Sequence, residues 1–221
     1  MRTDTNPSGK RVTQRSPKLD RRARSANRSD TRSALVRCGV EMFAERGFQA
    51  TGIDEVLKRV GVPKGSFYHF FPSKQAFGEA VIDSYAQYFE RKLDRLLTDD
   101  SRPPLERLAA FVEEARLGMT KHQFQRGCLI GNLGQELWEL NGRFRQKLEG
   151  VLLSWQHRTA ACLREAAAAG ELATRLNEAD SEMLARFFWI GWEGAILRAK
   201  LTQNDEPLRL FADCFFKKFL R

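Results

Sequence analysis

Three residues with the chemistry to bind phosphate stand together at a predicted helix start. Lys64, Gly65 and Ser66 offer a cation, an unobstructed backbone and a hydroxyl group, directly after Pro63. Proline is favoured in the first turn of a helix, where free backbone amides already attract phosphate. This segment therefore predicts contact with the phosphates of a nucleic acid.

The residues that follow are divided between two faces of the same predicted helix. Phe67 and Phe71 are four positions apart and can pack inward, whereas Tyr68 and His69 can point outward. The outer face would meet base edges in a DNA groove, while phosphate contacts would set the register. We expect base-edge contacts from Lys64, Tyr68 and His69, and contacts with the DNA backbone from Thr51, Gly65, Ser66 and Lys74.

A second candidate site centres on a cysteine. Cys128 follows a glycine at the expected start of a short helix and stands near Arg126. Both the helix start and the cation favour the thiolate over the thiol, so this cysteine is predicted to be reactive. The alternative is that Cys128 is a small buried hydrophobic residue.

Further candidates lie on a later, strongly apolar helix. Trp189, Glu193, Ile196 and Lys200 share one face, because steps of four, three and four return to the same side. A charge within so apolar a helix is costly unless it is paired or liganded. Alternatively, Lys200 simply stabilises the helix end through the dipole. The residues predicted to bind a small effector are Cys128, Arg126, Trp155, Trp189, Glu193 and Lys200.

The phosphate-binding segment needs a preceding helix to hold it. Apolar residues recur at three- and four-residue steps from Ile53 to Val60, and Thr51 with Asp54 forms a capping-box pattern. Gly61 and the residues up to Pro63 then break this helix, since glycine tolerates left-handed backbone and proline disfavours helix before it. Two short helices joined by a sharp turn predict a helix-turn-helix.

The stretch from Phe43 to Lys74 resembles the DNA-binding domain of the TetR family of bacterial transcription regulators. The resemblance is carried by Phe43-x3-Gly47-Phe48-x2-Thr51, Gly61-Val62-Pro63 and Gly65-Ser66-Phe67-Tyr68-x2-Phe71-x2-Lys74. The chain departs from the family pattern at Gly52, Val60 and Phe70. Phenylalanine cannot donate a hydrogen bond to phosphate, so one expected backbone contact is lost at Phe70.

The resemblance implies an all-α homodimer that binds double-stranded operator DNA. A three-helix helix-turn-helix domain would precede a helical domain for effector binding and dimerisation, whose last two helices pair with their symmetry mates. Two heads one helical turn apart imply a nearly palindromic operator. We expect a disordered basic arm over residues 1–29, the DNA-binding domain over 30–75, and the effector-binding and dimerisation domain over 76–221.

A narrower resemblance points to one branch of the family. Gly127-Cys128-Leu129 and the run from Trp189 to Leu201 look like the branch that responds to electrophiles and small unsaturated compounds, which includes acrylate-responsive and N-ethylmaleimide-responsive repressors. In that branch the effector acts at the cysteine matching Cys128 or in the pocket around it. We therefore expect a repressor that a small electrophilic or unsaturated effector releases from its operator.

Helical patterns continue to the end of the chain. Ser73 can cap a long helix that would connect head and body, Pro103-Pro104 can open another, and Gly170 can end a third. Asn177 can cap a strongly apolar helix to about Leu201, and a last one follows Asp205. Apolar side chains on these two C-terminal helices face several directions, which favours dimerisation. No segment shows strand alternation.

Composition narrows the class of protein further. With 42% hydrophobic residues the 221-residue chain can build a real core, yet no apolar run approaches the ~18 residues of a membrane helix. Nine lysines and arginines against two aspartates in residues 1–29 hold most of the net charge of +9. This arm either follows the DNA backbone or is a solvated tail. We expect a cytoplasmic protein without membrane contact.

The sequence gives less support to Cys128 as a metal ligand or as a catalytic nucleophile. The four cysteines and three histidines are scattered, so we expect free thiols and neither a metal site nor a cofactor. An enzyme with Cys128 as nucleophile and His122 or His157 as base lacks any motif that places a base beside the thiol. A non-covalent sensor of a small carboxylate, anchored by Lys200 or Arg126, stays open as the alternative within the regulator class.

Overall fold

The computed structural model describes residues 17–137, 142–172 and 176–220, and these are helical with connecting loops, so the predicted all-α fold is confirmed. The elements are α1 (Pro17–Arg46), α2 (Ile53–Val60), the 3-10 turn η1 (Lys64–Ser66), α3 (Phe67–Phe70), α4 (Lys74–Leu97), α5 (Pro104–Lys121), α6 (Leu129–Leu137), α7 (Gly142–Ala168), α8 (Glu178–Thr202), α9 (Glu206–Cys214) and the π-helical turn η2 (Phe215–Phe219).

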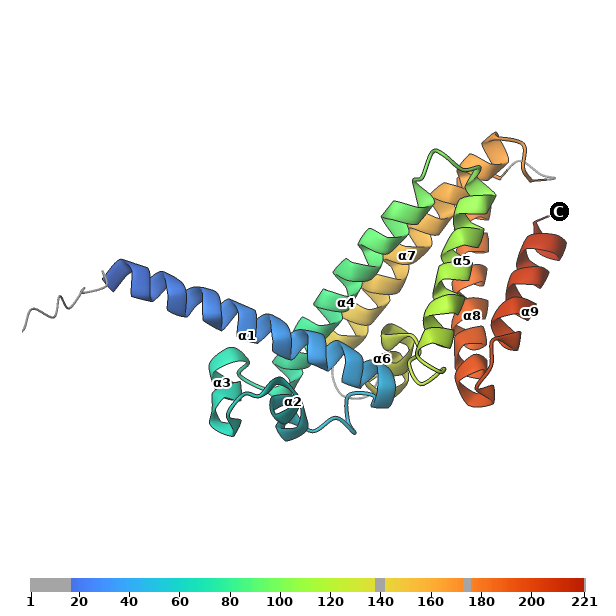
Figure 1. Ribbon diagram of the computed structural model, residues 1–221. Helices are drawn as coiled ribbons and strands as arrows, with labels where there is room; N and C mark the ends of the chain where they lie inside the picture. Colours follow the sequence, from blue (N-terminus) through green and yellow to red (C-terminus); the bar gives the residue numbers. More distant parts are fainter. Residues whose placement is uncertain (1–16, 138–141, 173–175, 221) are drawn as a thin grey trace, which may run out of the picture.

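A head built from α1, α2 and α3 lies at one end of the molecule (Figure 1). Its core is aromatic: the ring of Phe77, from α4, lies 5.7 Å from Phe43, 5.7 Å from Phe67 and 5.0 Å from Phe71 between ring centroids. Because α4 begins at Lys74, the predicted boundary between residues 75 and 76 falls inside one continuous helix. The first turns of α4 thus belong structurally to the head.

The start of α2 differs from the prediction. Its N-cap is Gly52, with no side-chain cap, whereas the predicted cap Thr51 is buried and its hydroxyl donates to the Gly47 carbonyl at 2.7 Å. Thr51 therefore closes the turn after α1, and the capping-box prediction was wrong. The other end is as predicted, since Gly61 takes the left-handed conformation (φ 74°) that only glycine adopts without strain.

The basic arm was also predicted incorrectly in part. Residues 17–29 continue α1 as helix, although they were expected to be disordered. Leucine, alanine and arginine are good helix formers, Pro17 suits a first turn, and the segment extends a helix already anchored by packing at residues 35–44. The remainder of the predicted arm, residues 1–16, lies outside the described residues.

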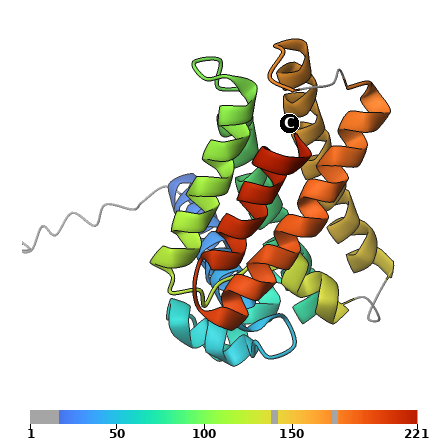
Figure 2. The same ribbon diagram turned by 90° about the vertical axis from the view of Figure 1, so that its right-hand side faces the viewer.

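The body is a bundle of α4 to α9, whose helices are seen along their length in Figure 1 and from the α8 and α9 side in Figure 2. The predicted helix ends are confirmed: Ser73 Oγ accepts from the Ala76 amide at 3.1 Å, Asn177 Oδ1 accepts from the Asp180 amide at 2.9 Å, and Gly170 (φ 75°) follows the end of α7. The cysteines are free, as expected. Over the described ranges, no helix has both the length and the apolar content needed to span a membrane.

Candidate functional site

The surface predicted to read DNA lies on the head, at η1 and α3. Lys64, Gly65, Tyr68 and His69 are exposed there, and the Tyr68 side chain is 73% accessible. Lys64 forms an exposed ion pair with Asp54 at 2.5 Å. The recognition element is shorter than expected, because a 3-10 turn replaces the first part of the predicted helix. Four of the seven residues predicted to contact DNA are thus exposed on these two neighbouring elements.

Two residues predicted to hold phosphate are engaged elsewhere. Thr51 is buried with its hydroxyl bonded to Gly47, so it does not present that hydroxyl to phosphate in this structure. Lys74 is partly buried: its ammonium donates to the Gln49 carbonyl at 3.2 Å and lies 4.7 Å from the Phe48 ring centroid. Burial lowers the pKa of Lys74. Both side chains therefore bind backbone carbonyls in the loop between α1 and α2.

Sequence reasoning missed two cations that support α3 from α1. Arg28 donates from Nη2 to the His69 carbonyl at 2.5 Å, and the Arg32 guanidinium lies 4.9 Å from the Phe71 ring centroid. They stand one helical turn apart on α1, which places them on one face, but this spacing does not show which element packs there. The N-terminal helix thereby holds the end of the reading element.

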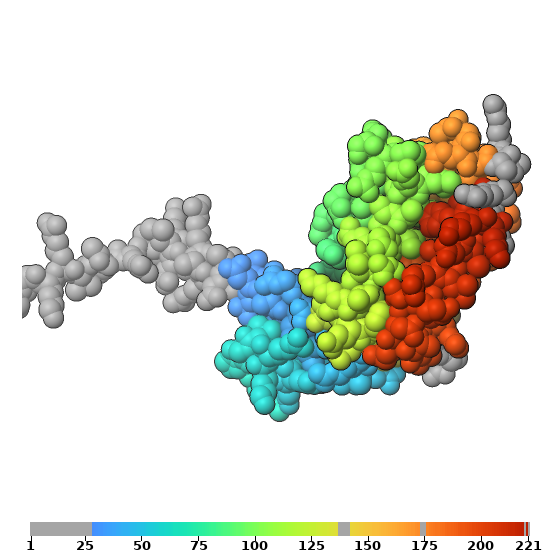
Figure 3. Space-filling model, turned by 45° about the vertical axis from the view of Figure 1, so that its right-hand side comes forward, coloured from blue at the N-terminus to red at the C-terminus, as the bar shows by residue number. Residues whose placement is uncertain are grey.

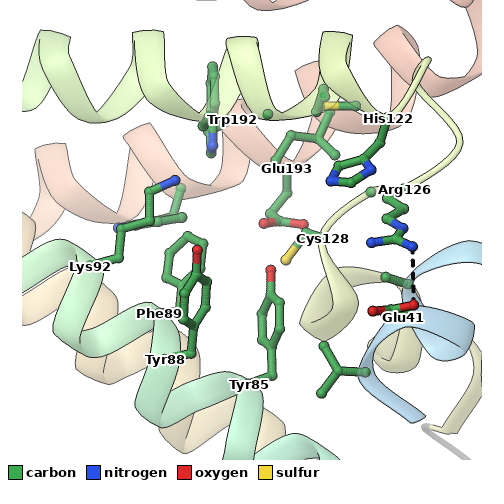
Figure 4. A pocket seen from close by; sticks show the side chains of 18 residues that line it. Glu41, Tyr85, Tyr88, Phe89, Lys92, His122, Arg126, Cys128, Trp192 and Glu193 are labelled. Atoms are coloured by element: carbon green, nitrogen blue, oxygen red, sulfur yellow. Dashed lines mark hydrogen bonds and ion pairs between the residues drawn. The ribbon is translucent and has the colours of Figure 1, made fainter. Parts of the chain in front are cut away.

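A pocket of about 280 Å³ lies where head and body meet (Figure 4). Its walls come from α1, α4, α5 and α8 and from the segment between α5 and α6. The lining residues include Val40, Glu41, Ala44, Tyr85, Tyr88, Phe89, Lys92, His122, Arg126, Cys128, Trp189, Trp192, Glu193 and Ile196. A helix of the head therefore forms part of the pocket.

Four predicted effector residues meet in this pocket, and two do not. Cys128, Arg126, Trp189 and Glu193 line it. Trp155 is instead fully buried behind the wall, with its ring centroid 4.3 Å from Phe89 and 5.0 Å from Trp189. Lys200 donates to the carbonyls of residues 44 and 45, at 3.5 and 3.3 Å, and so holds the C-terminal end of α1.

The environment of Cys128 contradicts the prediction of a thiolate. Burial and the neighbouring Glu193 carboxylate raise the pKa of the Cys128 thiol well above its usual value. Arg126, which was expected to favour the thiolate, instead pairs with Glu45 at 2.8 Å and Glu41 at 3.4 Å. These two carboxylates come from α1, more than 80 residues earlier in the chain, so local sequence could not reveal them. The resting sulfur is a neutral thiol.

Glu193 is the other unusual group in the pocket. Burial raises its pKa to about 7, while a hydrogen bond from the Cys128 thiol acts in the opposite direction. Its Oε1 atom is buried without a hydrogen-bond partner. Gly131, in the first turn of α6, leaves the room that Glu193 needs, since a Cβ there would overlap Oε2. A buried, unpartnered carboxylate oxygen is costly and suggests a site that serves a ligand or a reaction.

The lining residues from α4 were missed as site residues. Tyr85, Tyr88 and Lys92 line the pocket, but none of them was among the residues predicted to bind the effector. Lys92 lies 6.0 Å from the Phe89 ring centroid and pairs with Glu114 at 3.3 Å. An aromatic stripe at helical spacing is typical of core and pocket walls alike, so the pattern could not separate them.

Helix α6 links this pocket to the head. Glu136 accepts from the Phe48 and Gln49 amides at 2.6 and 3.3 Å, and Asn132 Nδ2 donates to the Ala44 carbonyl at 3.1 Å. Since Cys128 immediately precedes α6, one short helix has the pocket at its first turn and the loop between α1 and α2 at its last. A shift of α6 would therefore act directly on the end of α1 and on the loop that precedes α2.

Comparison with known proteins decides the family. Residues 35–81 match the family described as "Bacterial regulatory proteins, tetR family", and residues 104–215 match "Tetracyclin repressor-like, C-terminal domain". The chain belongs to the TetR family of transcription regulators. It is therefore a DNA-binding repressor of this type rather than an enzyme, and the predicted family is confirmed.

Similar TetR proteins cover nearly the whole chain. The transcriptional regulator AcuR of Cereibacter sphaeroides is 48% identical over 99% of this chain and 96% of its own length. The transcriptional repressor NemR of Escherichia coli is 31% identical over 81% of this chain and 88% of its own. A crystal structure of a TetR regulatory protein from Rhodobacter sphaeroides superposes with a TM-score of 0.79, at 50% identity, over 84% of this chain and 96% of that one.

Proposed function

We propose that this TetR protein is a homodimeric repressor that leaves a nearly palindromic operator when a small α,β-unsaturated compound adds to Cys128. The observation that carries the proposal is the placement of the Cys128 thiol in a pocket that α1 of the head helps to form. The branch that the sequence resembles responds to such electrophiles. Capture of an effector here would act on both the pocket and the reading head.

A stripe of exposed apolar residues supports the dimer. Met183, Phe187, Ile190, Leu197 and Leu201 on α8 are all exposed, and with Gly194 they follow alternating steps of four and three. This heptad spacing is typical of a helix that packs against another along its length. No neighbouring atom lies within 4 Å of a Cβ built at Gly194, which leaves room for close approach of a second helix. Figure 3 shows the last two helices, in orange and red, open at the surface.

The non-covalent carboxylate sensor is less well supported. Both predicted anchors are engaged: Lys200 binds carbonyls at the end of α1, and Arg126 pairs with Glu45 and Glu41. The buried carboxylate of Glu193 would also repel an anionic ligand. We therefore favour the covalent mechanism.

Substitution of the cysteine tests the proposal. Wild-type protein should leave its operator after exposure to acrylamide, with one adduct per protomer mapped to Cys128 by mass spectrometry. Cys128→Ser should need at least tenfold more acrylamide for release, because serine is a far weaker nucleophile. Operator occupancy followed by fluorescence anisotropy measures this directly.

A control variant separates specific from general alkylation. Cys214 is partly exposed on α9, so Cys214→Ser removes a thiol that can react without involving the pocket. This variant should release the operator at the wild-type concentration. If Cys128→Ser released it at that concentration too, covalent sensing at Cys128 would be wrong.

A further inference from the structure

A neutral, buried thiol poses a chemical problem for a covalent sensor. The thiolate is the nucleophile in additions to electrophiles, and a thiol whose pKa lies well above its usual value supplies almost none at neutral pH. Transfer of the proton to solvent would leave an isolated negative charge in an apolar pocket, which is costly. A reactive Cys128 therefore needs a proton acceptor within the pocket.

The Glu193 carboxylate is placed to be that acceptor. In Figure 4 it lies directly beside the Cys128 sulfur, and the Tyr85 hydroxyl points to the same place from α4. The Gly131 amide lies 3.5 Å from Sγ and donates to it. The Cys128 sulfur thus lies beside one proton acceptor, the Glu193 carboxylate, and near two hydrogen-bond donors, the Gly131 amide and the Tyr85 hydroxyl.

We propose that Glu193 is the proton acceptor for Cys128 and that its carboxylate removes the thiol proton as the sulfur adds to the electrophile. This inference rests on the proposed function and extends it, because it names the group that makes the buried thiol reactive. It also gives a role to the buried carboxylate of Glu193, which the proposed function leaves unexplained.

Charge bookkeeping favours transfer within the pair. A thiol beside a carboxylate and a thiolate beside a carboxylic acid both carry one negative charge, so moving the proton between them buries no additional charge. Backbone amides of Gly131 and Ile130 lower the pKa of Cys128 and so stabilise the sulfur once it is negative. Burial keeps the pKa of Tyr85 well above its usual value, so its hydroxyl remains a donor. The two groups then titrate as one coupled pair.

The reaction balances without any further reagent. The sulfur lone pair forms an S–C bond to the β-carbon of an α,β-unsaturated carbonyl compound, and the π electrons move to the α-carbon and carbonyl oxygen as an enolate. The thiol proton passes to Glu193 and is returned to the α-carbon. The product is a thioether, there is no leaving group, and Glu193 regains its initial protonation state.

Other charged or titratable groups line the pocket from α1, α4 and the segment between α5 and α6. They are Glu41 from α1, Tyr85, Tyr88 and Lys92 from α4, and His122 and Arg126 from the segment between α5 and α6. Arg126 and Glu41 form an ion pair with each other, and Lys92 pairs with Glu114. A pH profile must therefore be compared with that of a variant in which Glu193 alone is changed.

The pH dependence of alkylation tests the inference on the full-length protein. Acrylamide is neutral at every pH used, and the rate of adduct formation at Cys128 can be followed by mass spectrometry between pH 5.5 and 8.5, in the absence of DNA. Wild type should react faster as the pH rises toward about 7, where the pair loses its first proton, and should then level off. A rate that still climbs tenfold per pH unit through pH 8.5 would show that the proton leaves to solvent, and would overturn the inference.

Glu193→Gln provides the second measurement. Glutamine fills the same space but cannot accept the proton, so adduct formation at pH 7 should fall at least tenfold and the plateau should disappear. Glu182→Gln, which removes a carboxylate from the same helix outside the pocket, should keep the wild-type rate and profile. If Glu193→Gln reacts as fast as wild type or faster, the carboxylate merely suppresses the thiolate and the inference is wrong.

The two proposals fail in different ways. If the rate of adduct formation at Cys128 did not depend on Glu193, the proton-acceptor role of Glu193 would be excluded, and covalent sensing would remain supported. If the adduct formed with the expected pH dependence but the protein stayed on its operator, the proposed function would be excluded, and proton transfer to Glu193 would remain supported. If no Cys128 adduct formed up to pH 8.5, both would be wrong. Should Glu193→Gln fail to fold, the wild-type profile alone still decides.

Discussion

At the scale of single residues, Tyr68 stands out because an aromatic side chain with 73% exposure contributes little to the core. Its ring touches Phe67 edge-on at a centroid distance of 5.4 Å and otherwise projects from the head. A side chain in this position is available to a DNA groove, where one good contact is worth about 1–3 kcal/mol.

Tyr68→Ala should therefore weaken operator binding about tenfold or more without loss of stability. Fluorescence anisotropy at fixed salt measures the affinity, and thermal unfolding with sedimentation checks that fold and dimer persist. Wild-type affinity in this variant would show that the outer side of α3 does not read DNA.

Single residues also show where sequence reasoning stops. Cys128 and Glu193 were both selected from the sequence as effector-binding candidates, and both line the pocket. Their protonation was not predictable, because it depends on burial and on the carboxylates of Glu41 and Glu45 that capture Arg126. The capping prediction for Thr51 failed for a related reason: its hydroxyl donates to the Gly47 carbonyl instead of accepting from the Asp54 amide.

At the scale of elements, α6 is short but holds the head in place. Glu136 accepts hydrogen bonds from two backbone amides in the loop between α1 and α2, and Gln49 Nε2 donates to the Glu136 carbonyl at 3.4 Å. Gly47 (φ 86°) leaves space for this carboxylate, since a Cβ there would overlap it. Head and body are thus joined by polar contacts as well as by packing.

Glu136→Ala should lower the free energy of unfolding by about 1–3 kcal/mol, because two amides lose a charged acceptor. Urea denaturation measures this change. Gln135→Ala is the matched control, since Gln135 is an exposed neighbour on the same helix, and it should be nearly neutral. Equal midpoints for the two variants would show that this junction contributes nothing to stability.

The ends of elements were predicted where their signals are local. Ser73 and Asn177 cap the helices that follow them because side chain and amide are three residues apart. By contrast, the helix over residues 17–29 was not predicted. The basic composition of this segment, which lacks aromatic residues, indicated that it would not be buried. Composition also does not show how far an anchored helix extends beyond its packed part. The pocket itself could not be predicted, since it forms between α1, α4, α5 and α8.

At the scale of the whole molecule, the exposed stripe on α8 needs a partner. Ile190 and Leu201 are each 68% exposed, and they lie on the seam defined by the heptad steps. Apolar side chains in a continuous row favour association over solvation. Under the proposed pairing of two protomers through this stripe, their two heads would be held at a fixed separation.

Ile190→Glu should produce a monomer and reduce operator affinity at least a hundredfold, because a charge buried in an apolar seam is unpaired. Analytical ultracentrifugation gives the oligomeric state. The same substitution at Leu117, which is exposed on α5, should leave the dimer unchanged. A dimeric Ile190→Glu protein would place the interface elsewhere.

The wall that α1 contributes through Val40, Glu41 and Ala44 has a consequence for the cell. Because α1 belongs to the DNA-reading head and also forms this wall, operator DNA that holds α1 in its bound position would slow addition of the effector at Cys128. Repressor molecules away from any promoter would then intercept traces of the compound first. The gene would be expressed only after these free molecules have reacted. The copy number of the protein would therefore set the amount of effector that is needed to induce the gene.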